Sequence, residues 1–187
     1  MALPCLRIWS CGPSPVRRSQ ASTAATTAWT SAGIPTRTTS AAWPISTSQQ
    51  TLYIFEEHRA QKETDAQLAE ALRRHLHDEI IGDSAANRSI ATLRDLGFDR
   101  LRGCRKYAAH GGTSVTDGMK WLQSRAKIVI DPQRCPWTAR EFSEYEYAID
   151  KKTGDVMPGY VDAANHSIDM TRYAMEPVWQ KRGVQNA

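Results

Sequence analysis

Acidic side chains are absent from the first 55 residues of this 187-residue chain. Arg7, Arg17, Arg18 and Arg37 give that segment a charge of +4, whereas the 20 basic and 20 acidic residues from Glu56 onward cancel. The formal net charge of +4 therefore belongs to the first segment alone. For this reason the charge of the whole chain does not indicate that the later part binds nucleic acid.

Other absences narrow the class of protein. No apolar run approaches the roughly 20 residues of a membrane-spanning helix, and the N-terminal stretch lacks the apolar core of a signal peptide. The four cysteines form no Cys-x-x-Cys pair, so neither a zinc knuckle nor a disulfide framework is indicated. No glycine-rich phosphate loop is present, which argues against an NTPase. We expect one soluble, intracellular globular domain.

Residues 1–50 and 51–187 differ in pattern. The stretch SQASTAATTAWTSAGIPTRTTSAAWPISTSQQ is rich in Ser, Thr and Ala in no periodic order, which predicts an irregular or disordered segment. From position 51 onward, strand and helix patterns alternate. This alternation predicts a layered α/β sheet.

Individual elements follow from the pattern of that second part. Capping boxes at Thr64 with Gln67 and at Thr138 with Glu141 mark two helix starts, and Gly97 closes a third helix. A last helix is expected from near Asp162 to about Trp179. The predicted strands are 51–57, 80–84, 98–104 and 126–131. The predicted helices before the last one are 64–79, 88–97, 113–125 and 136–149.

Three side chains are candidates for a metal site. Asp83 follows a buried strand, and ligand sites in open α/β sheets form at the carboxyl ends of strands. His166 and Asp169 are three positions apart, so one helical face carries both. Hard oxygen ligands with one imidazole suit Mg²⁺ or Mn²⁺. The alternatives are that Asp83 caps the following helix, that His166 is a structural histidine, and that Asp162 only starts a helix.

Four motifs together resemble a known family. They are IIGDSA followed by a basic helix, SVTDGMKWLQSRAKIVIDPQRC, EFSEYEYAIDKKTGD and VDAANHSIDMTRYAM. From about Thr51 to Met175 the chain resembles the C-terminal nuclease domain of phage terminase large subunits. The resemblance implies a ribonuclease-H-like mixed sheet flanked by helices. It also implies an endonuclease that uses two Mg²⁺ or Mn²⁺ ions to cut double-stranded DNA during packaging.

The resemblance assigns roles to particular residues. It implies that Asp83 and Asp169 are catalytic, and that Asp83, His166 and Asp169 bind metal. A basic stretch from 88 to 127, with nine Lys or Arg against three Asp, could contact phosphates, although a solvated helical face would have the same composition. The candidates for DNA contact are Arg88, Arg105, Lys106 and Lys120. The implied partners are the small terminase subunit and the portal, in the host cytoplasm.

One departure from the family concerns its first acid, which lies on the central strand of the sheet. No Asp precedes Glu56, so we expect the first two strands to be missing, residues 1–50 to be irregular, and residues 51–187 to form an incomplete nuclease-like domain. A frame shift would explain the loss. Trp29-Thr30 must be encoded TGG-ACN, and moving the frame back by one nucleotide turns its centre into GAC, the codon of Asp.

These observations are compatible with three classes of protein. The first expectation is a terminase nuclease domain that is inactive as it stands, without the ATPase domain that such subunits carry upstream. A catalytically dead DNA-binding or prophage-remnant protein is the non-enzymatic alternative. A nuclease of the resolvase or transposase type has the same kind of sheet and is the rival enzyme.

Overall fold

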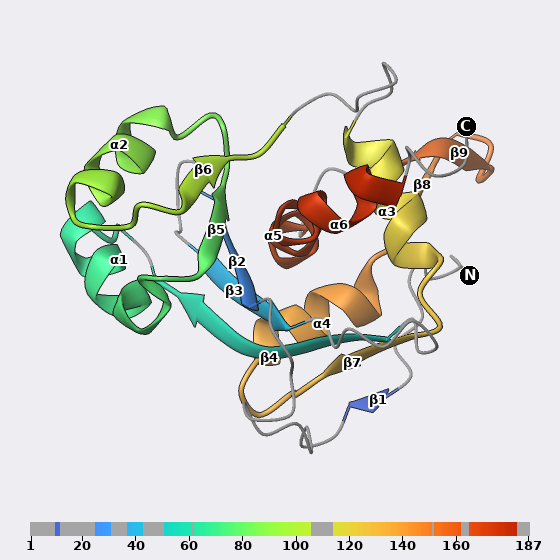
Figure 1. Cartoon of the computed structure of the whole chain (residues 1–187). Coiled ribbons are helices and arrows are strands. Elements are labelled where there is room, and N and C mark those ends of the chain that lie inside the picture. Colours follow the sequence, from blue (N-terminus) through green and yellow to red (C-terminus); the bar gives the residue numbers. More distant parts are fainter. Residues whose placement is uncertain are drawn as a thin grey trace.

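A seven-stranded mixed sheet forms the centre of the computed structural model, in the order β1-β7-β4-β3-β2-β5-β6 (Figure 1). The structure describes residues 10–11, 25–30, 37–42, 51–60, 62–105, 114–150, 152–161 and 165–182. The sheet strands are β1 (Ser10–Cys11), β2 (Ala25–Thr30), β3 (Arg37–Ala42), β4 (Thr51–Arg59), β5 (Glu79–Gly82), β6 (Leu101–Gly103) and β7 (Lys127–Ile130). A separate hairpin joins β8 (Tyr147–Ile149) to β9 (Val156–Tyr160).

Helices cover the sheet and account for the rest of the described elements. They are α1 (Asp65–Leu72), the 3₁₀ turn η1 (Arg73–His75), α2 (Asn87–Asp95), α3 (Ser114–Gln123), α4 (Pro136–Glu144), α5 (His166–Ala174) and α6 (Glu176–Arg182). Figure 1 shows α1 and α2 on one side of β5 and β6, with α5 and α6 on the other. No helix in the described ranges is long and apolar enough to cross a membrane.

The strand order combines an antiparallel meander with parallel strands. The strands β2, β3 and β4 pair antiparallel in succession, whereas β5 runs parallel to β2 and β6 runs parallel to β5. On the other edge, β7 runs parallel to β4. The mixed sheet flanked by helices that the sequence predicts is therefore present.

The expectation that the first two strands are missing and that residues 1–50 are irregular is wrong for the described parts of that segment. Strands β2 and β3 lie in the middle of the sheet, paired in register from Ala25 with Ala42 to Thr30 with Arg37. The physical reason is that strand pairing uses backbone N–H and C=O groups, which depend little on side-chain pattern. Threonine is also β-branched and favours strands. The strand is therefore present although the expected acid is not.

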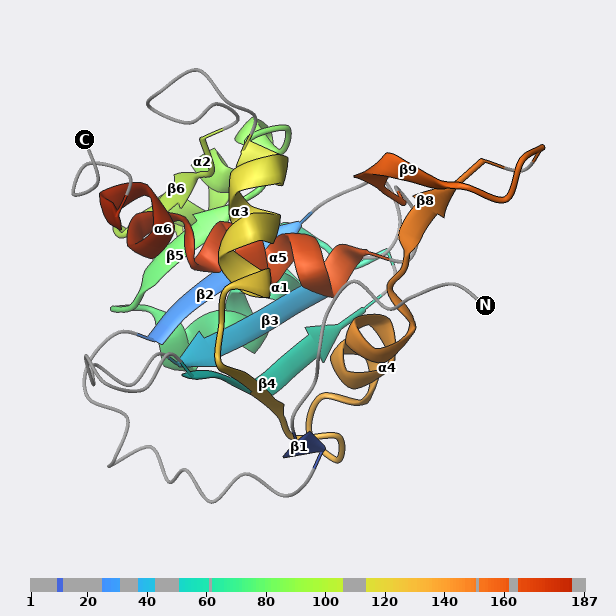
Figure 2. The ribbon, with the colours of Figure 1, turned by 90° about the vertical axis from the view of Figure 1, so that its right-hand side faces the viewer.

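Two apolar clusters fix the helices on the sheet. One packs β4 and β7 against α3, α4 and α5, with Leu52, Ile130 and Phe142 fully buried. The other packs β5 and β6 against α1 and α2 around Ile80 and Leu93. Helix α5 packs across β2 and β3, on the face of the sheet that the first cluster covers (Figure 2). This crossing places α5 beside the carboxyl end of β5.

The local predictions have mixed outcomes. The capping box of Thr64 with Gln67 is confirmed, and Gly97 ends the region of α2 with a φ of +100°. The capping box at Thr138 is wrong, because Cys135 is the N-cap of α4 and makes no side-chain cap bond. The single last helix is also wrong, because Met175 separates α5 from α6. Asp162, its expected start, lies outside the described residues.

Candidate functional site

Asp83 follows the last residue of β5, as the sequence predicts, and begins the turn into α2. Its Oδ1 accepts a hydrogen bond of 2.9 Å from the Ala85 N–H, and its backbone carbonyl accepts one of 2.9 Å from the Ala86 N–H. These bonds show that Asp83 shapes the turn before α2. The alternative that Asp83 caps this helix is wrong, because Ala86 is its N-cap and no side chain makes a cap bond there. In the described part of the chain, no hydrogen bond or ion pair occupies its Oδ2, so one carboxylate oxygen is left for a ligand.

Asp169 lies in the first turn of α5, and His166 is the first residue of the same helix. The Arg172 guanidinium donates to Oδ1 of Asp169 through Nη2 at 2.5 Å and through Nε at 3.2 Å. Asp169 is only partly buried, whereas the Arg172 side chain is 2% exposed. Arg172 thus holds one oxygen of Asp169, and among the described residues no hydrogen bond or ion pair occupies the second oxygen.

Tyr173 connects the two carboxylates. Burial raises the pKa of this phenol, and the negative charges of Asp169 and Asp83 raise that pKa further, whereas the charge of Arg172 lowers it. Both carboxylates therefore act on one side chain of α5. Because α5 packs against β5, Asp169 and Asp83 lie on neighbouring elements although they are 86 positions apart (169 − 83).

The family's first acid, expected on the central strand, has no counterpart in the first 55 residues. Trp29 of β2 is the register partner of Gly82, so the next position along each parallel strand is Thr30 on β2 and Asp83 after β5. Neither Trp29 nor Thr30 carries a carboxylate. The described residues contain no group of three or more His, Cys, Asp or Glu side chains that could hold a metal ion. The roles of Asp83, His166 and Asp169 as ligands remain a prediction.

The donors that are present fit a hard divalent cation in part. Two carboxylates with an open oxygen each, and one imidazole nearby in sequence, are the ligand types that Mg²⁺ and Mn²⁺ accept. Two carboxylates are too few to hold a pair of ions, because a two-metal site needs a ligand that bridges both. The present residues therefore fit one weakly held ion.

The four candidates for DNA contact lie on different elements. Arg88 is an exposed residue in the first turn of α2, and Lys120 is an exposed residue of α3. Arg105 follows β6 with its side chain 69% exposed and 3.8 Å from Glu176. Lys106 lies outside the described residues. Their contact with DNA stays a prediction.

Sequence reasoning missed the residues that hold α5 in place. Oε2 of Glu141, from α4, accepts a buried hydrogen bond of 2.6 Å from the Ser167 N–H in the first turn of α5. A Cβ added to Gly118 of α3 would lie 3.0 Å from Cδ of Arg172, so this glycine makes room for the guanidinium stem. The Glu141 pattern looked like a local capping box, and only the fold shows that it caps another helix.

Comparison with known structures defines the class of fold. The nuclease domain of the large terminase g2p of bacteriophage SPP1, solved with bound Mn, superposes with a TM-score of 0.75 at 28% identity over 94% of this chain and 98% of that chain. The P22 large terminase nuclease domain shares the fold at a TM-score of 0.62 and 17% identity, covering 89% of this chain and 86% of that one. The sheet is therefore of the large-terminase nuclease type, as the resemblance implied.

The sequence places the chain in its family. Residues 36–177 match the family described as terminase RNase H-like domain, and the chain belongs to this family. It is also 37% identical over 145 residues to the terminase large subunit of Bacillus phage SPP1, a match that covers 76% of this chain and 33% of that protein. The chain thus spans about a third of the length of this relative. The family match begins at residue 36 and leaves β2 outside it.

Proposed function

We propose that this chain is the metal-dependent endonuclease domain of a phage DNA-packaging terminase large subunit, and that it is inactive as it stands. The observation that carries the proposal is that Asp83, directly after β5, and Asp169, on α5, lie on neighbouring elements, because α5 packs against β5. The nuclease-like domain comprises residues 51–187 together with strands β2 and β3, which lie in the middle of its sheet. Its substrate is double-stranded DNA, its partners are the small terminase subunit and the portal, and it acts in the host cytoplasm.

Asp83, His166 and Asp169 are the residues that would hold Mg²⁺ or Mn²⁺. When bound, such ions activate a water and stabilise the leaving oxygen of a phosphodiester. The open oxygens of Asp83 and Asp169 supply negative charge toward which a cation is drawn. The Arg172 guanidinium keeps Asp169 in one orientation, and exposed Arg88 and Lys120 supply positive charge for the DNA backbone.

The inactivity follows from position 30 of β2. Thr30 occupies the place beside Asp83 where the family's first acid would complete the ligand set. In the alternative frame, the codon that spans Trp29 and Thr30 must encode Asp. The frame shift therefore removes an acid at the position of β2 that lies beside Asp83. A site without its bridging carboxylate should position neither ion for in-line displacement.

A plasmid-nicking assay tests the proposal. The 187-residue chain should show negligible Mn²⁺-dependent nicking, and the protein with the upstream frame restored should cleave duplex DNA with little sequence preference. In the restored protein, Asp169→Asn should abolish cleavage. Asp95→Asn, an exposed residue at the end of α2, is the matched control and should keep full activity. Full activity of Asp169→Asn would overturn the proposal.

The catalytically dead DNA-binding protein remains the second candidate because the expected acid is absent while exposed basic residues persist. It predicts salt-dependent binding of duplex DNA with no metal-dependent cleavage, even after the upstream frame is restored. The restored protein in the nicking assay therefore separates the two candidates.

A further inference from the structure

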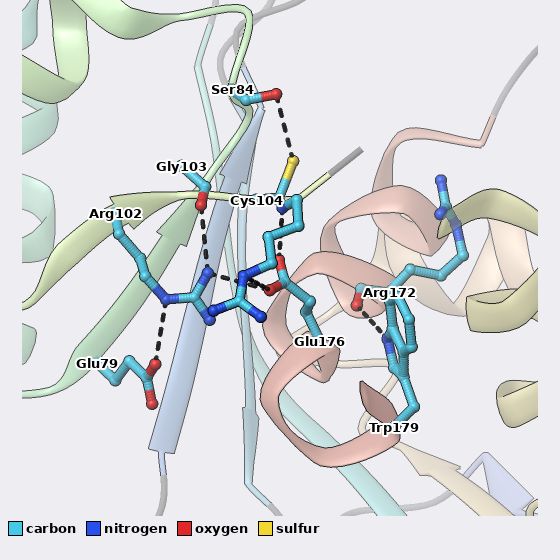
Figure 3. Close-up of polar contacts among 9 residues, drawn as sticks. Glu79, Ser84, Arg102, Gly103, Cys104, Arg172, Glu176 and Trp179 are labelled. Carbon is cyan, nitrogen blue, oxygen red and sulfur yellow. Dashed lines mark hydrogen bonds and ion pairs between the residues drawn. The ribbon is translucent and has the colours of Figure 1, made fainter. Parts of the chain in front are cut away.

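Glu176 is a buried carboxylate at the start of α6, and it connects this helix to the end of β6. Its side chain is 1% exposed. Oε1 accepts a hydrogen bond of 3.1 Å from Nη1 of Arg102, and Oε2 accepts one of 2.8 Å from the backbone N–H of Arg105. Figure 3 shows the carboxylate turned from its helix toward the strand. Both oxygens of Glu176 are therefore used on one neighbouring segment.

The segment that Glu176 grips is tied to the turn that carries Asp83. The N–H of Cys104 donates a hydrogen bond of 2.8 Å to the Gly82 carbonyl, and Gly82 directly precedes Asp83. In addition, the Cys104 thiol lies 3.8 Å from the Ser84 hydroxyl. Burial raises the pKa of this thiol, and the charges of Asp83 and Glu176 raise it further, so both carboxylates lie near Cys104. The end of β6 thus links Glu176 to Asp83.

On its other side, Glu176 is fixed to the helix that carries Asp169. The indole N–H of Trp179 in α6 donates a hydrogen bond of 3.1 Å to the backbone carbonyl of Arg172 in α5 (Figure 3). The side chain of the same Arg172 holds Asp169. Helices α5 and α6 are therefore locked together, and a shift of α6 would carry Asp169 with it.

We propose that Glu176 is a positioning residue that sets the separation of Asp83 and Asp169 by clamping α6 to the end of β6. This inference rests on the proposed metal site, because it concerns how two of its ligands are held. The two bonds on the β6 side of the clamp are 3.1 Å and 2.8 Å long and part-buried, and the Trp179 bond on the α5 side is buried, so they restrict movement between strand and helix. Arg102 also supplies the positive charge that a buried carboxylate requires.

Arg102 is oriented for this task by its other neighbours. Its Nε lies 3.5 Å from Oε1 of Glu79 on β5, and its Nη1 also donates to the Gly103 carbonyl at 3.2 Å. The guanidinium therefore connects β5, β6 and α6 at one point. A lysine has a single ammonium and cannot keep all of these contacts at once.

The test is Mn²⁺ binding by the 187-residue chain, followed through the electron paramagnetic resonance signal of free Mn²⁺, together with thermal unfolding. Four variants are compared with the unaltered chain: Glu176→Gln, Arg102→Lys, Asp169→Asn and Glu144→Gln. Glu144 is the control because it forms an exposed ion pair with Arg140 on α4. All titrations are made well below the unfolding temperature of each variant.

We expect Glu176→Gln to raise the Kd for Mn²⁺ about tenfold, the size of effect seen for residues that orient metal ligands. Arg102→Lys should raise it by a smaller factor, and this variant decides the question if Glu176→Gln does not fold. Glu144→Gln should leave the Kd unchanged. A purely structural role for Glu176 would lower the unfolding temperature without changing the Kd of the folded protein.

The outcomes separate this inference from the proposed function. If Asp169→Asn loses Mn²⁺ binding while Glu176→Gln and Arg102→Lys bind as the unaltered chain does, the positioning role is wrong and the metal site stands. If Asp169→Asn binds Mn²⁺ as well as the unaltered chain, or if the unaltered chain binds none, the proposed metal site fails and the positioning role fails with it.

Discussion

The guanidinium of Arg172 donates two hydrogen bonds to a single oxygen of Asp169, one turn earlier on α5. Arg172 is almost fully buried, and the ring of Tyr173 lies 5.4 Å from its guanidinium carbon. A buried cation needs a charged or polar partner, because its transfer out of water is costly. Asp169 is therefore a structural counter-ion as well as a candidate ligand.

Asp169→Asn should destabilise the chain. From the sequence alone, an acid in a metal-free acidic cluster would be expected to repel its neighbours, so its removal would leave stability unchanged or slightly raised. The pairing with Arg172 reverses that expectation. The amide keeps one acceptor but no charge, and we expect a loss of about 1–3 kcal/mol in the free energy of unfolding, measured by urea titration.

The matched change for that experiment is Asp95→Asn, since Asp95 is exposed at the end of α2. Its effect should stay within about 0.5 kcal/mol. Equal stability of Asp169→Asn and the unaltered chain would show that the Asp169–Arg172 pair contributes nothing to folding.

Gly118→Ala should also destabilise the chain, although alanine normally favours a helix by about 1 kcal/mol over glycine. The added Cβ would lie 3.0 Å from Cδ and 3.2 Å from Cγ of Arg172. Because Arg172 is buried, its stem has little room to withdraw, and we expect the clash to outweigh the gain in helix propensity. The measurement is the thermal midpoint. A raised midpoint for Gly118→Ala would show that Arg172 moves freely.

Glu141→Gln should weaken the first turn of α5. The carboxylate is 8% exposed and accepts from the Ser167 N–H at 2.6 Å, where the positive end of the α5 dipole favours a negative charge. We expect a loss of about 1–2 kcal/mol in the free energy of unfolding. Glu144→Gln, three residues later on the surface of α4, should cost less than about 1 kcal/mol. Equal losses for the two variants would exclude a special role for Glu141.

The stability of the chain should fall as the pH rises through the raised pKa of His75. Burial alone would lower the pKa of this imidazole, but its hydrogen bonds to Glu56 at 3.2 Å and Asp78 at 2.8 Å outweigh burial and raise that pKa above 6.5. The charged form is thus favoured in the folded state. Its contribution is complete below the unfolded-state pKa and is lost as the pH rises through the folded-state pKa.

Thermal midpoints across the pH range check the role of His75. His75→Gln should be less stable than the unaltered chain at pH 5, and this difference should shrink at pH 9. His77→Gln, an exposed neighbour, should follow the unaltered chain at every pH. A constant difference between His75→Gln and the unaltered chain would contradict the assignment.

The nucleotide sequence offers the most direct check of the missing acid. An uninterrupted alternative frame should run upstream of the region Gln49 to Leu52, encode Asp across codons 29 and 30, and continue into an ATPase domain. A stop codon in that frame between codons 20 and 48 would contradict the frame-shift hypothesis.

Much of the fold could be predicted from the sequence, because the signals were local. The strand of β4, the capping box of α1 and the glycine after α2 each depend on residues within a few positions of one another. The four motifs, among them the one around His166 and Asp169, together indicated the family, which the family match confirms. Strands β2 and β3 could not be predicted in this way, since their residues lack a clear apolar alternation and their pairing is made by the backbone.

The sequence by itself determined the family, the positions of Asp83 and Asp169 at element ends, and the absence of an acid before Glu56. Only the tertiary structure decided what surrounds them. It paired Asp169 with Arg172, and it made the Glu141 carboxylate cap α5 and not its own helix. It also joined Glu176 to residues more than 70 positions earlier. The physical reason is that a buried charge must find its partner wherever the packed chain brings one, and sequence distance does not constrain that choice.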